Sequence, residues 1–457
     1  MRCTWRCVGA CWSSPDGRRS RPRAGGTAIL LAAVWALALA AAGPAGAAVR
    51  VAPGEPLQAA LERAPAGATV RLAPGVHRGP VVVSRPLALV GEPGAVIEGD
   101  GRGSVVRVRA PDVRIAGLTI RGGGGDLTAL DAAVFVERTA ARVRIEGNRI
   151  ESPAFGVWLD QTPDAVVRGN RIHGDPRRRS QDRGNGVHLY YLEGAVVEGN
   201  EIWETRDGIY IDNSRRCVLR GNRIRDLRFG IHYMYSHDNR VEGNRTTRTR
   251  TGYALMQSRG LTVVGNRSEG DRNYGILLNY ITYSRIVGNV VRGVRGQRGH
   301  ATGGAAVAGG EGKALFVYNS EYNEIRGNLF AESDIGVHLT AGSEDNVIVG
   351  NAFVANRVQV KYVASRQQEW SRDGRGNYWS DYLGWDLDGD GVGDRPYWPN
   401  DAVDLLLWRY PLARLLMHSP AVRTLRWVQE HFPVLRPPGV RDSHPLMRPP
   451  PLPEALS

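Results

Sequence analysis

Cysteine, methionine and lysine are all scarce in this chain of 457 residues. It contains four Cys and five Met, and all but two of its 59 basic residues are Arg. Three of the four Cys lie within the first 47 residues, and the rest of the chain keeps only Cys217. Because a single Cys cannot form an internal disulfide, the fold after residue 47 must be held together by other contacts.

Long apolar runs are also scarce, and the one clear example lies near the N-terminus, from Thr27 to Ala42. Four Arg between residues 18 and 23 precede it, and the small residues 43–47 follow it. This order predicts a cleaved secretory signal peptide over residues 1–47, with an uncleaved membrane anchor as the alternative. The run is a little short to span a bilayer. We therefore expect a protein that is exported from the cytoplasm and has no membrane span of its own after cleavage.

The overall charge of +13 falls to +8 once the six Arg and one Asp of residues 1–47 are removed. The remaining Arg are dispersed, and export makes nucleic acid an unexpected partner. Glycine is frequent at 57 residues, but it follows no G-X-Y period, which excludes collagen. An apolar content of 42% excludes a disordered chain.

Two glycine series recur in phase along the chain. Gly-Asn pairs place their asparagines at Asn148, Asn170, Asn200, Asn222, Asn244, Asn266, Asn289, Asn328 and Asn351. The most frequent interval between these asparagines is 22 residues. A second series, Gly156, Gly186, Gly208, Gly230, Gly252, Gly275, Gly312 and Gly336, precedes short strand-like segments. A fixed period of this length indicates a repeat architecture.

The repeat predicts an all-β fold, a right-handed parallel β-helix over residues 48–377 with coils of about 22 residues. Each coil would hold two glycine turns and about three short strands. Asn tolerates the left-handed conformation at turns, and stacked Asn side chains can form a hydrogen-bonded ladder. A leucine-rich repeat is the main competitor, but its LxxLxL frame is absent. Residues 55–64 would form a helix that caps the N-terminal end.

Two insertions lengthen the coils at the same corner, between Asn170 and Gly186 and between Asn289 and Gly312. The first contains Arg177, Arg178 and Arg179. Both loops should project from one edge of the β-helix, where loops often carry function. Tolerated insertion without function is the alternative.

Aligning the coils on the second glycine gathers His and Met on one outward face. Two residues after the glycine come Trp158, His188, Tyr210, His232, Ala254, Leu277, Ala314 and His338; four residues after it come Tyr190, Asp212, Met234, Met256, Asn279 and Thr340. Strand alternation points both columns away from the core. Thioether and imidazole ligands suit Cu(I), so His188, His232, Met234 and Met256 are candidate copper ligands. Packing beneath a loop or a partner protein is the alternative.

Residues 378–400 include an Asp-rich loop with the D-x-D-x-D-G frame of calcium sites. Asp386, Asp388 and Asp390 would be oxygen donors, and Asp394, or Asp401 or Asp404 after a bend, could complete the shell. Tyr397 stands at the twelfth position, so the loop is not an EF-hand. An acidic turn filled with water is the alternative.

Residues 401–457 are predicted to form a tail with two short helices, over 405–416 and 420–432, and an extended Pro-rich end. Ser419 is suited to the N-cap and Pro420 to the first helical position. We expect this tail to dock on a membrane partner, with simple capping of the β-helix end as the alternative.

Several segments make the chain resemble the NosD family of nitrous-oxide reductase maturation proteins. They are Arg206–Tyr210, Phe229–Ser236 (FGIHYMYS), Gly252–Met256, Tyr274–Tyr280, Gly336–Glu344 and Gly376–Tyr382. The resemblance implies a periplasmic, non-enzymatic protein that works with an ABC-type ATPase and its membrane permease. Together they would support assembly of the copper-sulfur cluster of nitrous-oxide reductase, with the reductase or a copper chaperone as a further partner.

Two other functions compete with this interpretation. A carbohydrate-active β-helix enzyme, such as a lyase or epimerase, would need paired carboxylates in a groove. Asp207 could form such a pair with Asp212 or with Asp160. A scaffold that docks a protein without binding metal is the other alternative.

Overall fold

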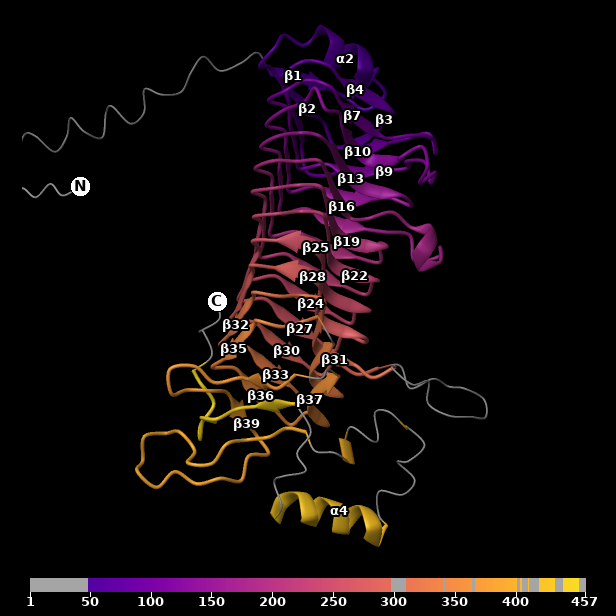
Figure 1. Ribbon diagram of the computed structural model, residues 1–457. Coiled ribbons are helices and arrows are strands. Elements are labelled where there is room, and N and C mark those ends of the chain that lie inside the picture. The colour runs from indigo at the N-terminus through magenta and orange to yellow at the C-terminus, as the bar shows by residue number, and fades with distance from the viewer. Residues whose placement is uncertain are drawn as a thin grey trace, which may run out of the picture. The chain divides into compact units, whose positions relative to one another are not determined.

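The computed structural model describes residues 48–296, 310–340, 342–363, 366–400, 403–404, 410, 419–431 and 439–451. Parallel strands stack coil on coil into a right-handed β-helix with three sheets, as the repeat predicted (Figure 1). The predicted signal peptide over residues 1–47 lies outside the described residues. No helix among the described residues is long and apolar enough to cross a membrane.

Each coil contributes one strand to each sheet. Sheet 1 contains β1 (Ala48–Val51), β2 (Thr69–Leu72), β5 (Ala88–Gly91), β8 (Arg114–Ala116), β11 (Arg144–Glu146), β14 (Val166–Arg168), β17 (Val196–Glu198), β20 (Val218–Arg220), β23 (Arg240–Glu242), β26 (Thr262–Val264), β29 (Arg285–Val287), β32 (Glu324–Arg326) and β35 (Val347–Val349).

Sheet 2 has the longest strands and carries the candidate site. It contains β4 (Val81–Val83), β7 (Val106–Val108), β10 (Ala132–Val136), β13 (Phe155–Asp160), β16 (Val187–Tyr190), β19 (Asp207–Asp212), β22 (Phe229–Met234), β25 (Thr251–Arg259), β28 (Tyr274–Thr282), β31 (Lys313–Tyr318), β34 (Ile335–Thr340) and β37 (Val358–Val363).

Sheet 3 follows sheet 1 in each coil, after a tight turn. It contains β3 (Gly75–Arg78), β6 (Ala95–Glu98), β9 (Thr119–Arg121), β12 (Arg149–Glu151), β15 (Arg171–His173), β18 (Glu201–Trp203), β21 (Arg223–Arg225), β24 (Arg245–Thr247), β27 (Arg267–Glu269), β30 (Val290–Arg292), β33 (Leu329–Ala331), β36 (Ala352–Val354) and β39 (Tyr378–Trp379).

The core fills the space between the three sheets with aliphatic side chains. Ile209 and Ile211 of β19, Leu219 of β20 and Ile224 of β21 are all buried there. The alternation of a strand sends the intervening side chains outward. This arrangement confirms the predicted inward positions of sheet 2.

The Gly-Asn pairs form the turn between sheets 1 and 3, and their asparagines form the predicted ladder. Asn200 Nδ2 donates to Asn222 Oδ1 at 3.0 Å, and Asn222 Nδ2 donates to Asn244 Oδ1 at 2.9 Å. The residue that adopts the left-handed turn conformation differs from the prediction. It is the glycine and not the asparagine, as at Gly221 with φ +62°.

Most of the second glycine series lies inside the sheet 2 strands, and Gly186 lies immediately before β16. A Cβ on Gly208 would lie 2.5 Å from Ile224 Cγ2 and 2.6 Å from the carbonyl oxygen of Gly230. These glycines therefore allow neighbouring coils to pack closely. Gly312 does not belong to the series, because Ile276 pairs with Leu315 and Ala314 takes the glycine position. Phe316, rather than Ala314, then follows Leu277 in the outward column.

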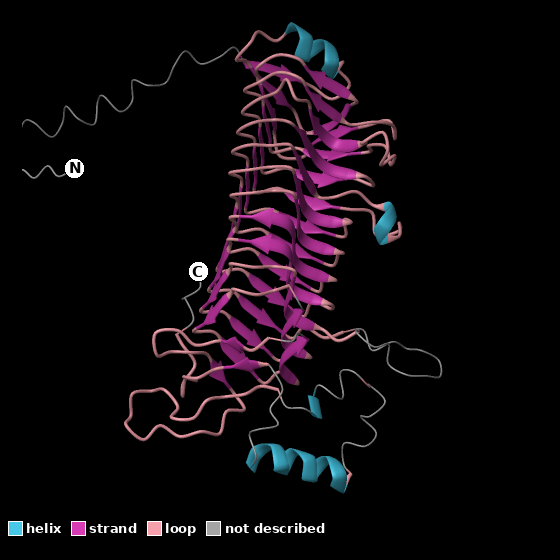
Figure 2. Cartoon of the chain, viewed as in Figure 1, coloured by secondary structure: helices cyan, strands magenta, loops and turns pink. Residues whose placement is uncertain are grey.

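Two loops at one corner of the β-helix contact each other over sheet 2. The first insertion, residues 174–186, contains the short helix η1 (Ser180–Asp182), visible at the edge of the strands in Figure 2. Arg178 Nη1 donates to the carbonyl oxygen of Gly125, in residues 122–131, at 3.0 Å. This second loop was not recognised from the sequence. Residues 297–309 of the other predicted insertion lie outside the described residues.

Both ends of the β-helix carry additional elements. Helix α2 (Leu57–Arg63) buries Leu57, Ala60 and Leu61 at the N-terminal end, which confirms the predicted capping helix. Near the C-terminus, β38 (Gln368–Glu369) pairs with β40 (Val440–Arg441). Helix α4 (Pro420–His431) agrees with the second predicted tail helix. Most of the predicted helix over 405–416 lies outside the described residues.

Candidate functional site

A cavity of about 460 Å³ lies on the outer face of sheet 2, over strands β13, β16, β19 and β22. Loop residues contribute to its walls, so the outward face of these strands is partly covered. The lining residues include Leu127, Phe155, Trp158, Arg183, Asn185, His188, Arg206, Asp207, Tyr210, Asp212, Arg228 and His232.

One column of side chains crosses the floor of this cavity. The strand register aligns Trp158, His188, Tyr210 and His232 in consecutive coils. The Tyr210 ring centroid lies 4.7 Å from that of His188 and 4.5 Å from that of His232. Both histidines point away from the core as expected, yet they are only 8% and 7% exposed. The outer face is therefore less open here than strand alternation alone predicted.

Asp207 joins two neighbouring coils through a buried network. Its carboxylate accepts hydrogen bonds from Arg228 Nε at 2.8 Å and Nη2 at 2.6 Å, and lies 2.9 Å from His232 Nδ1. Burial acts to raise the pKa of Asp207, but His232 and Arg228 outweigh it and hold the pKa below its usual value. The carboxylate is thus ionised and fixes the His232 ring.

Local spacing in the sequence did not indicate this network. The repeat itself holds the signal. Arg228 lies 22 residues after Arg206, which precedes Asp207, so it occupies the equivalent place in the next coil. A search by coil position rather than by local spacing would have paired Asp207 with Arg228.

His188 is held as a neutral side chain. Burial lowers its pKa to about 3, although the nearby Asp207 opposes the shift. Asn185 Nδ2 lies 3.1 Å from His188 Nδ1, and because an amide nitrogen can only donate, Nδ1 must accept. Tyr210, between the two histidines, has its pKa raised to about 12, chiefly by burial.

The structure places the two candidate methionines beside this cavity. Met234 ends β22, and Met256 lies in the next strand, β25; both are partly exposed. Ser236 and Ser258 each follow two residues later, and Ser236 N donates to Ser258 Oγ at 3.0 Å, so the methionines occupy equivalent positions in adjacent coils. His232 lies two residues before Met234 on the same strand. His188 lies two coils from His232.

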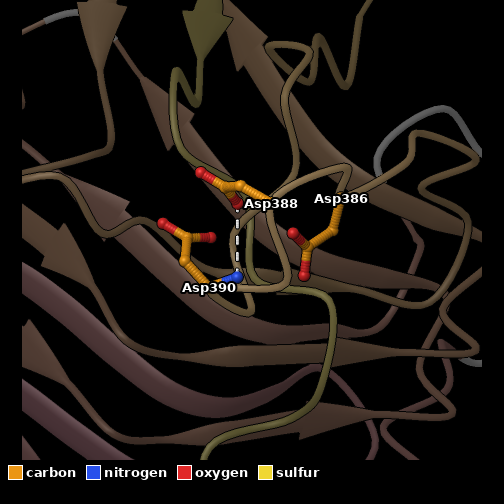
Figure 3. A group of neighbouring side chains, drawn as sticks. All are labelled: Asp386, Asp388 and Asp390. Carbon is orange, nitrogen blue, oxygen red and sulfur yellow. Dashed lines mark hydrogen bonds between the residues drawn. The ribbon is translucent and has the colours of Figure 1, made fainter.

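The Asp-rich loop brings three of its four candidate residues together (Figure 3). Asp386, Asp388 and Asp390 can each offer an oxygen within 4.8 Å of the others, and no other group of three His, Cys, Asp or Glu in the described part of the chain does so. Asp394 stands outside this group and accepts from Leu387 N at 2.8 Å. Partial burial acts to raise the pKa of Asp386, but the amides of Gly391 and Gly389 hold it below its usual value.

The remaining cysteine lies away from these sites, within the hydrophobic core. Cys217 is fully buried, and this burial raises the pKa of its thiol to about 12. A thiol in this state is a poor metal ligand, because the thiolate is the form that binds metal.

Comparison with known families identifies related proteins. Residues 168–384 match the model of the family described as periplasmic copper-binding protein (NosD). A protein of Pseudomonas aeruginosa named probable ABC transporter binding protein NosD is 60% identical over 374 residues, which cover 82% of this chain and 87% of the relative. A protein of the same name from Stutzerimonas stutzeri is 58% identical, over 81% of this chain and 85% of its own length.

Solved structures resemble the chain in fold alone. A Yersinia enterocolitica family 28 exopolygalacturonase superposes with a TM-score of 0.51 at 12% identity, over 69% of this chain and 76% of its own. The Streptococcus pneumoniae surface adhesin PfbA gives a TM-score of 0.50 at 10% identity, over 66% of this chain and 87% of its own. Because one is an enzyme and the other an adhesin, the shared β-helix does not identify an activity.

Proposed function

Because the chain belongs to the NosD family of periplasmic copper-binding proteins, we propose that it handles copper in the periplasm during maturation of nitrous-oxide reductase. The signal peptide over residues 1–47 would export it. In this proposal the chain performs no catalysis itself and works with an ABC-type permease and its ATPase. Copper is its cargo, received from a copper chaperone or passed toward the reductase.

The observation that supports a copper site is the grouping of His232, Met234 and Met256. Thioethers and imidazole are soft ligands that suit Cu(I). Adjacent coils place the two methionines about 4.8 Å apart along the β-helix. His232 Nδ1 is engaged by Asp207, which leaves Nε2 for an ion. A carboxylate that orients a ligating histidine in this way is a recurrent support for metal sites.

His188 fits a single copper ion less well than the other three candidates. Two coils separate it from His232, a distance of roughly 10 Å along the axis, whereas bonds from one ion to imidazole nitrogens are about 2 Å long. Its Nδ1 also accepts from Asn185. We therefore assign the proposed ion to His232, Met234 and Met256. His188 is not included among its ligands and is described only as a residue that lines the cavity.

A titration of the mature protein with Cu(I), in competition with a chromophoric chelator, tests this site. We expect the double variant Met234→Leu/Met256→Leu to lose one equivalent of tightly bound Cu(I). Met447→Leu is the matched control, because Met447 lies in the C-terminal segment bonded to Gly391. An unchanged copper stoichiometry in the double variant would contradict the assignment.

We also propose that the loop of Asp386, Asp388 and Asp390 binds Ca²⁺, with Asp394 recruited when the ion enters. Three carboxylates with oxygens this close repel one another, and an oxygen-ligated cation would relieve the repulsion. Calcium should raise the thermal midpoint of the wild-type protein and should not raise that of Asp388→Asn/Asp390→Asn. An equal response to calcium in both proteins would remove the site from consideration.

The tail supports the proposed docking on a membrane permease through α4. Leu425 and Trp427 of this helix are 40% and 55% exposed. Exposed apolar side chains on one short helix are typical of a contact surface. Leu425→Ser/Trp427→Ser should therefore weaken co-purification with the permease and leave copper binding unchanged. The described end of the tail also packs on the last coil, where Trp379 Nε1 donates to Asp442 at 2.8 Å.

The network around Asp207 also bears on the carbohydrate-active alternative. A general acid needs a raised pKa, whereas the Asp207 carboxyl, bound to Arg228 and His232, has a lowered one. Its contacts suit a residue that positions His232. The enzyme alternative would be revived if the protein produced new reducing or unsaturated uronate ends on a panel of polysaccharides.

A further inference from the structure

The cavity over sheet 2 holds four buried polar atoms without a hydrogen-bond partner among the described residues. They are Trp158 Nε1, Asn185 Oδ1, His188 Nε2 and Arg206 Nε, and all four residues line the cavity. Trp158, Asn185 and His188 are 7%, 7% and 8% exposed. Each unsatisfied buried group destabilises the folded state. Four of them around one cavity point to a ligand that satisfies them.

Three of these four atoms are hydrogen-bond donors. The indole nitrogen of Trp158 and the guanidinium nitrogen of Arg206 can only donate. His188 is neutral and its Nδ1 accepts from Asn185, so its proton is on Nε2. The cavity therefore presents three N–H groups that need an acceptor.

The charge of Arg206 strengthens this preference for an anion. Arg228, in the same place one coil later, is paired with the carboxylate of Asp207. Arg206 forms no ion pair or side-chain hydrogen bond with the part of the chain that the structure describes. Arg183, the third arginine of the lining, donates to the backbone carbonyls of Arg178, Glu204 and Pro176, and so fastens the loop.

The rest of the wall suits an organic body rather than a bare ion. Phe155, Trp158 and Tyr210 supply ring faces and edges, and Leu127 adds an aliphatic side chain. A volume of about 460 Å³ is within the range of small-molecule sites, which is roughly 300–1,000 Å³. An inorganic oxoanion alone would leave most of this space and the aromatic wall unused.

We propose that this cavity binds a small organic carboxylate. Its carboxylate accepts hydrogen bonds from Arg206, His188 and Trp158, and its body lies against Phe155 and Tyr210. None of the three donor residues is a proposed copper ligand, and Met234 and Met256 do not line the cavity, although His232 does. Binding needs no copper, so the inference does not rest on the proposed function.

Calorimetric titration of the mature protein, with a copper chelator present, tests this inference. The probes are benzoate and D-glucuronate, each beside its neutral counterpart, benzamide or D-glucose, and inorganic sulfate. We expect at least one of the two acids to bind about tenfold or more tightly than its neutral counterpart, and more tightly than sulfate.

Substitutions locate the binding. Arg206→Gln should weaken the acid by about tenfold or more, and Trp158→Phe, which removes only the N–H and part of the ring, by a few-fold. Arg250→Gln is the matched control, because Arg250 lies two coils after Arg206 and does not line this cavity. Its affinity should equal that of the wild type. Thermal melting of each variant confirms that it is folded.

Three results would overturn the inference. The first is that neither acid binds, and the second is equal binding of an acid and its neutral counterpart. The third is that folded Arg206→Gln and Trp158→Phe retain wild-type affinity. Tight binding of sulfate without either acid would replace the organic carboxylate with an inorganic oxoanion.

Discussion

The asparagine ladder between sheets 1 and 3 and the cavity over sheet 2 both bury polar side chains. They differ in whether those side chains find hydrogen-bond partners. In the ladder, Asn222 accepts from Asn200 N and Nδ2, and donates to Val197 O and Asn244 Oδ1, all between 2.9 and 3.0 Å. In the cavity, His188, Trp158 and Arg206 each keep an unsatisfied N–H. The two regions lie on the same repeated coils.

The difference separates a structural use of buried polarity from a functional one. A fully satisfied ladder stabilises the fold and has no capacity left for a ligand. Unsatisfied donors reduce stability, and they are retained where a ligand completes them. Substitutions in the ladder should therefore lower stability, whereas substitutions of the unpaired cavity groups should change binding without lowering stability.

The largest effect is expected in the ladder. Asn222→Ala removes four hydrogen bonds and leaves two buried donors of Asn200 unpaired, at a cost of about 4 kcal/mol in the free energy of unfolding. Urea denaturation measures it. Asn273→Ala, at a half-buried position whose side chain bonds to no described residue, is the control and should cost less than about 1 kcal/mol. Equal losses would mean that the ladder does not stabilise the coils.

Arg228→Gln should lower the free energy of unfolding by about 3 kcal/mol. It leaves the carboxylate of Asp207, which is only 1% exposed, without the guanidinium that pairs with it. The same urea experiment measures the loss. The substitution should also weaken Cu(I) binding, since Asp207 orients His232. Stability at the wild-type level would show that the pair contributes nothing net to the fold.

Gly208→Ala should lower the free energy of unfolding by about 2 kcal/mol, because the new Cβ would lie 2.6 Å from the carbonyl oxygen of Gly230 in the next coil. Gly221→Ala is the matched control at the ladder turn. A Cβ there would meet nothing nearer than Gly199 N at 4.0 Å, but the residue keeps φ at +62°, so a loss of about 1 kcal/mol is expected. If Gly221→Ala lowered the melting temperature more than Gly208→Ala, close packing between coils would not be the reason for glycine in sheet 2.

The buried histidine should make stability depend on pH. Burial lowers the pKa of His188 to about 3, whereas an unfolded histidine titrates near 6.5. Between these values the unfolded chain binds more protons, so the free energy of unfolding falls as the pH falls. Between pH 7.5 and 5.5 the wild type should lose about 1.4 kcal/mol more than His188→Asn. His338, whose pKa is also lowered to about 3, is present in both proteins and cancels.

The smallest effect is expected at Arg206. Because its guanidinium has no ion pair among the described residues, Arg206→Gln should lower the free energy of unfolding by less than about 0.5 kcal/mol. Urea denaturation beside Arg228→Gln, one coil away, measures the contrast. A loss as large as that of Arg228→Gln would show that Arg206 is a structural cation and not a ligand group.

Much of the fold follows from spacing in the sequence. The two glycine series predicted the parallel β-helix, and the Gly-Asn pairs predicted the ladder. The glycine spacing is misleading where an insertion changes the interval. It predicts Gly312 as the repeat glycine, but the strand register places Ala314 there, 14 residues before Asn328, as in the regular coils. Glycines near a loop end are ambiguous until the strands are paired.

The candidate site was less predictable. The column of His188 and His232 could be identified from strand alternation, but its burial could not. Residues 122–131 and 174–186 come from coils two apart, and they meet over sheet 2 through Arg178 and Gly125. The pairing of Asp207 with Arg228 likewise crosses from one coil to the next. Local sequence windows do not contain either contact.

The sequence by itself determined which residues repeat, which faces alternate and where each coil turns, because these depend on local conformation and a fixed period. Only the tertiary structure decided which buried polar atoms are satisfied. That outcome depends on where loops settle and how side chains of successive coils meet. The ladder asparagines find partners because every coil repeats the same geometry. Trp158, His188 and Arg206 lie where the loops interrupt that repetition, so their N–H groups remain available to a ligand.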